Sequence, residues 1–263
     1  MSRAAAEFPR KGGAQTGKGL LEKLFEIVYE DSGLLALNKP AGLVCHPTKG
    51  DAYSSLISRV RLHLGAGGQP QLVNRLDRET SGVTLVAKDA YTASSLRRLW
   101  EDRRVYKEYV AVVHGKVQNE HAVIQAALGK DDSSRVAIKD CVRADGAPAE
   151  TEYWVEERLG EPGGRDFTVL RVVPKTGRKH QIRIHLAYLG HPVVGDKLYG
   201  GDEDLYLALV EDRLTAEQRA RLMLPHHALH AREVRFKWEG MERIFQAGPE
   251  PWFEKFVSEH RRA

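Results

Sequence analysis

Apolar and polar residues along the chain follow patterns that predict many short strands and fewer helices. The predicted strands cover residues 25–30, 34–37, 83–87, 109–113, 122–128, 135–139, 151–154, 167–173 and 232–238. The predicted helices cover residues 54–64, 90–103, 178–189, 215–224 and 251–261. Because strands outnumber helices and do not alternate with them regularly, we expect an α+β fold with a mixed, mainly antiparallel sheet flanked by helices and loops.

The helix at 178–189 carries the most specific structural expectations. Thr176 can cap its N-terminus, and Gly190 is a typical stop signal. The side chains expected to face the core are those of Ile182, Leu186 and Leu189. The acidic residues 202–204 are expected to form a loop.

The first 20 residues differ in composition from the rest of the chain. They are rich in Gly, Ala, Lys and Arg and poor in large apolar residues, so we expect a flexible basic tail. Residues 12–18 match GxxxxGK, but Gly19 stands where a phosphate-binding loop needs Ser or Thr, and no strand precedes the match. We therefore reject nucleotide binding here and expect residues 21–263 to form one catalytic domain.

The chain has 263 residues and a formal net charge of +4, and its basic residues are clustered. Residues 97–107 contain five basic and two acidic side chains, a net charge of +3. Residues 175–197 contain five basic and one acidic side chain, a net charge of +4. Such clusters fit a phosphate backbone, although a solvated charged face is the plainer explanation for either one alone.

The cysteines and the hydropathy of the chain indicate the compartment in which the protein is expected to work. Cys45 and Cys141 are far apart and form no CxxC motif, so the sequence predicts neither a disulfide framework nor a zinc site. No apolar run is long enough to span a bilayer, and no signal peptide is recognisable. We expect a soluble cytoplasmic protein with no membrane association.

The polar segment 74–82, NRLDRETSG, is the most informative part of the chain. Asp77 lies between Arg75 and Arg78, and guanidinium groups keep a nearby carboxylate ionised. An ionised carboxylate in a pocket can act as a nucleophile. From this segment alone, a structural ion pair is an equally good explanation.

Other catalytic patterns are less well supported. His180 and His185 are five residues apart and do not form a metal-binding pair on one helix face, and the histidines at 226–230 lack acidic partners at ligand spacing. Ser81 lacks the GxSxG setting of an acyl hydrolase. A glycosidase pair of Asp77 and Glu79 is geometrically possible, but the basic clusters favour RNA over a neutral sugar.

Three motifs, in this order, resemble those of RNA pseudouridine synthases of the RluA type. They are NRLDRETSG, KEYVAVVHG and KTGRKHQIRIHLAYLGHPVVGDKLYG, and the earlier NKPAGLVCHP resembles the opening strand and turn of that family. The resemblance covers roughly residues 25–240. Separated motifs in a fixed order are far more specific than any one of them.

The resemblance implies roles for individual residues. Asp77 would be the catalytic residue, acting on a uridine flipped from its stack so that the base rejoins the sugar through carbon C5. Whether Asp77 attacks the sugar or the base, or takes part in elimination, stays open. Tyr109 would stack on the base and Arg183 would pair with Asp77, whereas Tyr106 matches no motif and is expected to pack. The expected RNA contacts are Arg75, Arg78, Arg178, Lys179 and His180.

The resemblance also defines what the chain would act on and how it differs from relatives. The implied activity is isomerisation of uridine in rRNA or tRNA without metal or cofactor, by a monomer whose catalytic domain selects the target. Asn74 departs from the pattern, which usually has His before RLD, and we expect altered substrate contacts rather than lost activity. The alternatives are an inactive RNA-binding protein of the same fold and an Asp-dependent hydrolase of small substrates.

Overall fold

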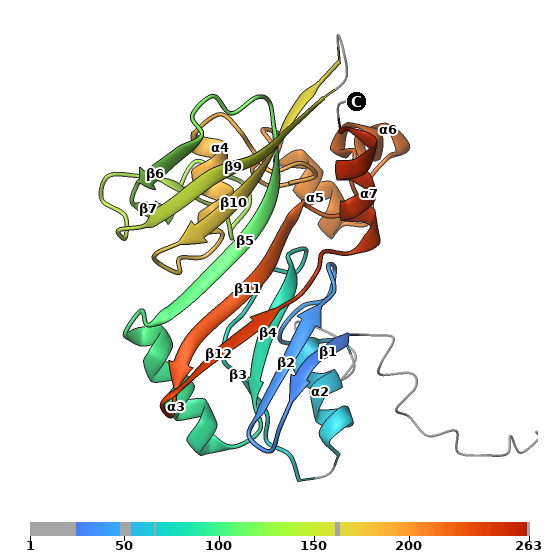
Figure 1. Ribbon diagram of the computed structural model, residues 1–263. Coiled ribbons are helices and arrows are strands. Elements are labelled where there is room, and N and C mark those ends of the chain that lie inside the picture. The colour runs from blue at the N-terminus through green and yellow to red at the C-terminus, as the bar shows by residue number, and fades with distance from the viewer. Residues whose placement is uncertain (1–24, 48–53, 66, 161–163, 262–263) are drawn as a thin grey trace, which may run out of the picture.

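One long, twisted sheet runs through the whole protein (Figure 1). The computed structural model describes residues 25–47, 54–65, 67–160 and 164–261. The expected tail at 1–20, with its GxxxxGK match, lies outside the described residues. Ten strands form the main sheet, eight of them in the order β1-β2-β4-β11-β5-β10-β9-β6, while β12 pairs with β11 and β3 with β4.

The strands of the main sheet are almost all antiparallel. They are β1 (Glu26–Glu30), β2 (Leu34–Lys39), β3 (Gln71–Leu72), β4 (Ser81–Ala87), β5 (Val105–His114), β6 (His121–Gln125), β9 (Glu150–Gly160), β10 (Asp166–Pro174), β11 (Leu229–Trp238) and β12 (Met241–Gln246). A separate two-stranded sheet joins β7 (Leu128–Lys130) to β8 (Asp140–Val142). The one parallel contact among the described strands joins β4 to β11 at the middle of the sheet. The expected mixed, mainly antiparallel α+β fold is confirmed.

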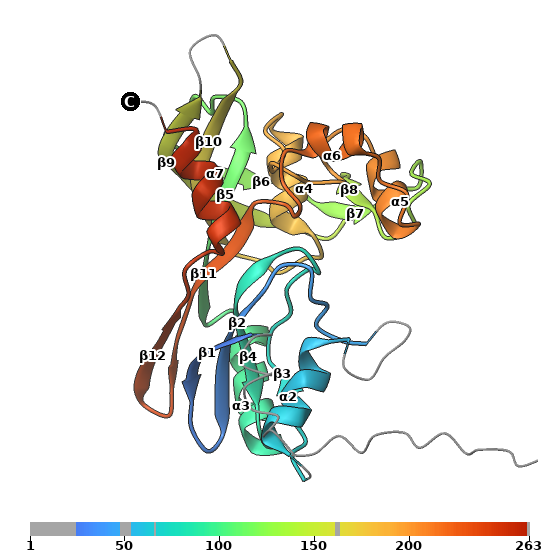
Figure 2. The ribbon, with the colours of Figure 1, turned by 90° about the vertical axis from the view of Figure 1, so that its right-hand side faces the viewer.

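The helices gather at the two ends of the sheet. They are α2 (Leu56–Leu64), α3 (Ala90–Glu101), α4 (Gln181–Tyr188), α5 (Asp204–Val210), α6 (Ala216–Leu222) and α7 (Pro251–Glu259). Figure 2 shows α2 beside the lower half of the sheet and α4 and α5 beside the upper half, on the same side. No helix in the described ranges is long and apolar enough to cross a bilayer.

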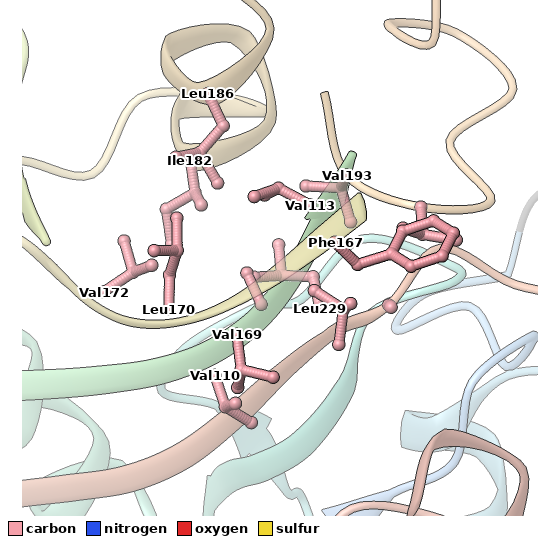
Figure 3. Close-up of a cluster of buried hydrophobic side chains, with 14 of the residues drawn as sticks. Val110, Val113, Phe167, Val169, Leu170, Val172, Ile182, Leu186, Val193 and Leu229 are labelled. Atoms are coloured by element: carbon pink, nitrogen blue, oxygen red, sulfur yellow. The ribbon is translucent and has the colours of Figure 1, made fainter. Parts of the chain in front are cut away.

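The largest apolar cluster fixes α4 against the upper half of the sheet. Figure 3 shows Ile182 and Leu186 of α4 above Leu170 and Val172 of β10, and all four side chains are buried. Burial of each such side chain contributes roughly 1.5–3 kcal/mol. Six consecutive residues of α4, 181–186, are buried, so this helix is enclosed on several sides rather than along one stripe.

Several predicted details differ from the structure. Residues 135–139 form turns rather than a strand, because Val136 alone enters the core while Ile138 is 43% exposed. The residues at 202–204 lead directly into α5, which begins at Asp204, rather than forming a separate loop. The predicted strand at 232–238 is present within β11, whereas β12 was not predicted.

The start of α4 also differs from the prediction. The helix begins at Gln181, and His180 before it adopts a left-handed backbone with φ 55° and gives no side-chain cap. The Thr176 hydroxyl instead bonds the Gln181 side chain at 2.7 Å and the Glu150 amide at 3.0 Å. Leu189, expected to face the core, lies after the last helical residue and is 39% exposed.

Gly82 is needed at the parallel contact between β4 and β11. Its φ of +113° is unfavourable for other residues, and a Cβ there would lie 2.3 Å from the Ala231 carbonyl oxygen. Gly201 has a similar φ of +101° but nothing within 4 Å of a Cβ position. Substitutions at the two glycines therefore distinguish the cost of backbone strain from the cost of a steric clash.

We predict that Gly82→Ala lowers the free energy of unfolding by about 3 kcal/mol or more, because strain and clash add. Gly201→Ala, the matched control, should cost about 1–2 kcal/mol from strain alone. Urea denaturation of both variants measures the difference. Equal losses of unfolding free energy in the two variants would show that β4 and β11 can move apart near Ala231 without loss of stability.

Candidate active site

Asp77 lies in the loop between β3 and β4, and this loop is tied to the turn after β2. The Arg78 carbonyl accepts bonds from the Gly42 amide at 2.9 Å and from the Lys39 ammonium at 3.1 Å. Lys39 is fully buried and also bonds the Pro40 and Leu43 carbonyls. The loop is therefore held to the turn after β2 at Arg78, the residue that follows Asp77.

Asn74 anchors the same loop to β4. Its side-chain amide donates to the Val83 carbonyl at 3.2 Å, and its side-chain oxygen accepts from the Leu85 amide at 2.7 Å. These two bonds resemble the pairing of a neighbouring strand. The residue that departs from the family pattern thus anchors the loop through backbone contacts, and it also lines the cleft that holds Asp77.

Arg183 of α4 joins Asp77 to a second carboxylate. Its Nη1 donates to Asp77 Oδ2 at 2.9 Å, while Nε and Nη2 donate to the two oxygens of Asp196 at 2.7 and 2.9 Å. The Asp196 side chain is fully buried and that of Arg183 is 8% exposed, whereas that of Asp77 is 28% exposed. Asp77 is therefore the carboxylate of this group that a ligand can reach.

The charges around Asp77 keep it ionised. Burial alone would raise the pKa of Asp77, but Arg183, His180 and His227 together hold that pKa below its ordinary value. Burial likewise opposes ionisation of Asp196, and Arg183 lowers the pKa of that carboxyl strongly. At neutral pH the site holds one guanidinium between two carboxylates.

Tyr109 of β5 lines the same cleft as Asp77 and Arg183, which has a volume of about 580 Å³. Burial, reinforced by the negative charge of Asp77, raises the pKa of the Tyr109 hydroxyl above its ordinary value. The phenol is therefore neutral at physiological pH. The cleft brings together an ionised carboxylate, a planar ring and cationic groups, which suits a flat, polar base attached to phosphate.

Glu79 faces a different set of partners from Asp77. Lys197, which is 3% exposed, contacts its carboxylate at 2.9 Å, and the rings of His226 and His227 lie within 3.7 Å. Burial would raise the pKa of Glu79, but His226 and Lys197 lower it to about 2. These contacts make Glu79 part of a buried ion-pair network. Through Lys197, Glu79 is linked to the turn after α4.

Ser81 and two of the histidines at 226–230 have structural partners. The Thr80 hydroxyl contacts His227 Nε2 at 2.7 Å, and the Ser81 hydroxyl contacts His230 Nδ1 at 2.9 Å. Both rings are buried, and burial lowers the pKa of each to about 4. No group of three potential metal ligands occurs within the ranges that the structure describes.

The cations predicted to contact RNA are only partly gathered at the cleft. Those that line it are Arg75, Arg178, Lys179 and His180. Lys179 pairs with Asp140 at 2.9 Å, and His180 directs Nδ1 to the Tyr199 hydroxyl at 2.8 Å. Arg78 does not line the cleft, and its Nε donates to the Gly42 carbonyl at 3.3 Å.

Two residues of the site were missed by reasoning from the sequence. Asp196 orients Arg183 and accepts bonds from the amides of Leu198 and Tyr199 at 2.9 and 3.0 Å. Tyr199 lies 5.0 Å beneath the Arg183 guanidinium and holds His180. Both stand in the segment GDKLYG, where an acidic residue inside an otherwise basic and apolar run was the available signal.

Comparison with known sequences agrees with this geometry. The family described as RNA pseudouridylate synthase matches residues 33–188. An uncharacterised RNA pseudouridine synthase of Bacillus subtilis, YlyB, is 37% identical over 66% of this chain and 57% of its own length. The dual-specificity RNA pseudouridine synthase RluA of Vibrio parahaemolyticus is 37% identical over 68% of this chain and 70% of its own length. A second uncharacterised relative, from Aquifex aeolicus, is matched over 55% of its length, so the chain spans little more than half of some relatives.

Solved structures agree as well. Human RNA pseudouridylate synthase domain containing 1 superposes with a TM-score of 0.69 at 26% sequence identity, covering 89% of this chain and 86% of that one. Human RNA pseudouridylate synthase domain containing 4 gives a TM-score of 0.67 at 25% identity, covering 90% of this chain and 94% of that one. The chain belongs to the RNA pseudouridylate synthase family.

Proposed function

We propose that this protein isomerises uridine to pseudouridine in structured RNA, with Asp77 as the nucleophile. The observation that carries the proposal is the pair of Asp77 and Arg183 at 2.9 Å in a cleft that Tyr109 also lines. An ionised carboxylate is costly to place near RNA phosphates, and a protein that only binds RNA has no need of one. The chemistry therefore explains the site better than binding alone does.

The reaction conserves the atoms of the nucleotide. The bond from N1 of the base to the sugar breaks, a bond from C5 to the same sugar carbon forms, C5 loses its proton and N1 gains one. Asp77 is 28% exposed and is the group placed to react with the flipped nucleotide. The neutral Tyr109 phenol can stack on the base, and it can accept the C5 proton only if its own proton leaves in the same step.

We propose ribosomal or transfer RNA as the substrate class. Relatives include a ribosomal large subunit pseudouridine synthase C of Pasteurella multocida, 36% identical over 82% of this chain. Arg75, Arg178 and Lys179 at the cleft are the proposed phosphate contacts there, and Arg78 and His180 are further proposed RNA contacts. Mapping pseudouridines in total RNA with and without the gene would identify the target positions.

We predict that Asp77→Asn lowers turnover by roughly 10⁴-fold or more while RNA binding stays measurable, because the amide keeps the shape but loses the nucleophile. Single-turnover pseudouridine formation in ribosomal RNA and filter binding measure the two quantities. Asp132→Asn, whose side chain is 72% exposed, is the control. Retained turnover in Asp77→Asn would rule out this mechanism.

Tyr109→Leu should lower turnover by roughly 5- to 100-fold, because a stacking contact of about 1–3 kcal/mol is lost. Tyr109→Phe keeps the ring and separates stacking from the hydroxyl. Thermal unfolding must accompany the kinetics, because Tyr109 packs partly against the core. A Leu variant that fails to fold would instead support a packing role for Tyr109.

Asp196→Asn should lower the free energy of unfolding by about 3–5 kcal/mol, because one partner of a buried ion pair is removed. Asp202→Asn is the matched control. Its partner Arg221 is 57% exposed, and the loss there should stay within about 1 kcal/mol. Denaturation in urea compares the two, and similar losses would mean that Arg183 does not depend on Asp196.

A further inference from the structure

A second, smaller groove adjoins the catalytic cleft. It has a volume of about 230 Å³ and is lined by residues of α3, β5 and the segment before α4. Five residues line both the groove and the cleft, namely Trp100, Lys107, Thr176, Gly177 and Arg178. The two hollows are therefore direct neighbours that share these five residues.

The groove joins the two basic clusters of the sequence. Arg103 and Lys107 come from the first cluster, and Lys175 and Arg178 from the second, against Glu101 as the one carboxylate among the described lining residues. The antiparallel pairing of β5 with β10 brings the segments together (Figure 1). Four cations around one carboxylate make a groove suited to a polyanion.

Lys107 is a partly buried cation of this groove whose charge is poorly compensated by its neighbours. Its ammonium is half-buried, and its one hydrogen bond among the described residues reaches the Thr176 carbonyl at 3.5 Å. Burial, together with the charge of Arg103, lowers the pKa of Lys107. By contrast, Lys175 already pairs with Glu152 at 2.6 Å, and Arg178 donates to the Pro148 carbonyl at 3.2 Å. A phosphate between Arg103 and Lys107 would compensate both charges.

Trp100 supplies an aromatic surface at the junction. It is the penultimate residue of α3, it is only partly buried, and it packs edge-to-face with Phe236 at 5.7 Å between ring centroids. Trp100 lines both hollows. A base can stack on such a ring whatever its sequence.

We propose that this groove is a second RNA subsite, which binds the nucleotide next to the reacting uridine. Arg103 and Lys107 contact its phosphate, and Trp100 stacks on its base. The inference rests on the proposed function, since it takes RNA as the molecule in the cleft. It adds a path for the RNA, which runs from Asp77 past Trp100 toward the start of β5.

The test compares binding of uridine monophosphate and of a uridine trinucleotide, both fluorescently labelled, to the full chain by fluorescence anisotropy. The wild-type protein should bind the trinucleotide more tightly, and Trp100→Leu should weaken that binding by roughly 5- to 100-fold. Trp100→Tyr, which keeps an aromatic ring, should retain most of it. In the double variant Arg103→Gln/Lys107→Gln, the slope of log affinity against log salt should fall by about 0.7 for each lost phosphate contact.

The matched control is Arg219→Gln, an exposed charge on α6 at the far end of the molecule, which should leave both affinities unchanged. Thermal unfolding of every variant shows whether the fold is kept. A wild-type protein that binds the trinucleotide no better than the monophosphate overturns the proposal. So does an unaltered salt slope in a folded double variant.

The same materials separate this proposal from the proposed activity. Pseudouridine formation in ribosomal RNA by a chain that shows no gain with strand length would reject the groove alone. A gain with strand length that depends on Trp100 and Lys107, in a chain that forms no pseudouridine, would support the groove and reject the activity.

Discussion

The guanidinium of Arg183, buried between two carboxylates, is the interaction on which the rest of the site depends. Removing such a charge from water costs several kcal/mol, and only well-placed partners offset that cost. Asp196 supplies them through two bonds to Arg183, and the amides of Leu198 and Tyr199 fix its carboxylate in turn. Because these bonds occupy Nε and Nη2, the Nη1 group is left to meet Asp77.

Holding Arg183 would be of little use if the loop carrying Asp77 could move. That loop is fixed by bonds from three directions: Lys39 to the Arg78 carbonyl, Lys197 to Glu79, and His227 to Thr80. None of these bonds uses the Asp77 carboxylate itself. The chain thus restrains the backbone around Asp77 and leaves one side of its carboxylate open to the cleft, which is the preorganisation that a nucleophile requires.

The sequence predicted the local elements well, and the family resemblance predicted the pairing of Asp77 with Arg183, but the other contacts across the site were not predicted. Asp77, Tyr109 and Arg183 could be found because each stands in a recognisable motif, and the strands because their apolar alternation is local. Asp196 could not be assigned to Arg183, since the pairing depends on how the chain turns after α4 and brings the two residues together. The prediction that Thr176 caps α4 was wrong, because its hydroxyl bonds the side chain of Gln181 and, through the tertiary fold, the amide of Glu150.

Asn74 shows how a departure from a family pattern can be absorbed. From the sequence we expected it to alter substrate contacts; both polar atoms of its amide bond the backbone of β4, and the residue also lines the cleft. A short side chain with adjacent donor and acceptor can continue the strand pairing where the backbone of the loop turns away. The residue at this position therefore anchors the loop as well as lining the cleft. Since Gly42 and Lys39 hold the same loop from its other side, the approach of Asp77 to Arg183 does not rest on Asn74 alone.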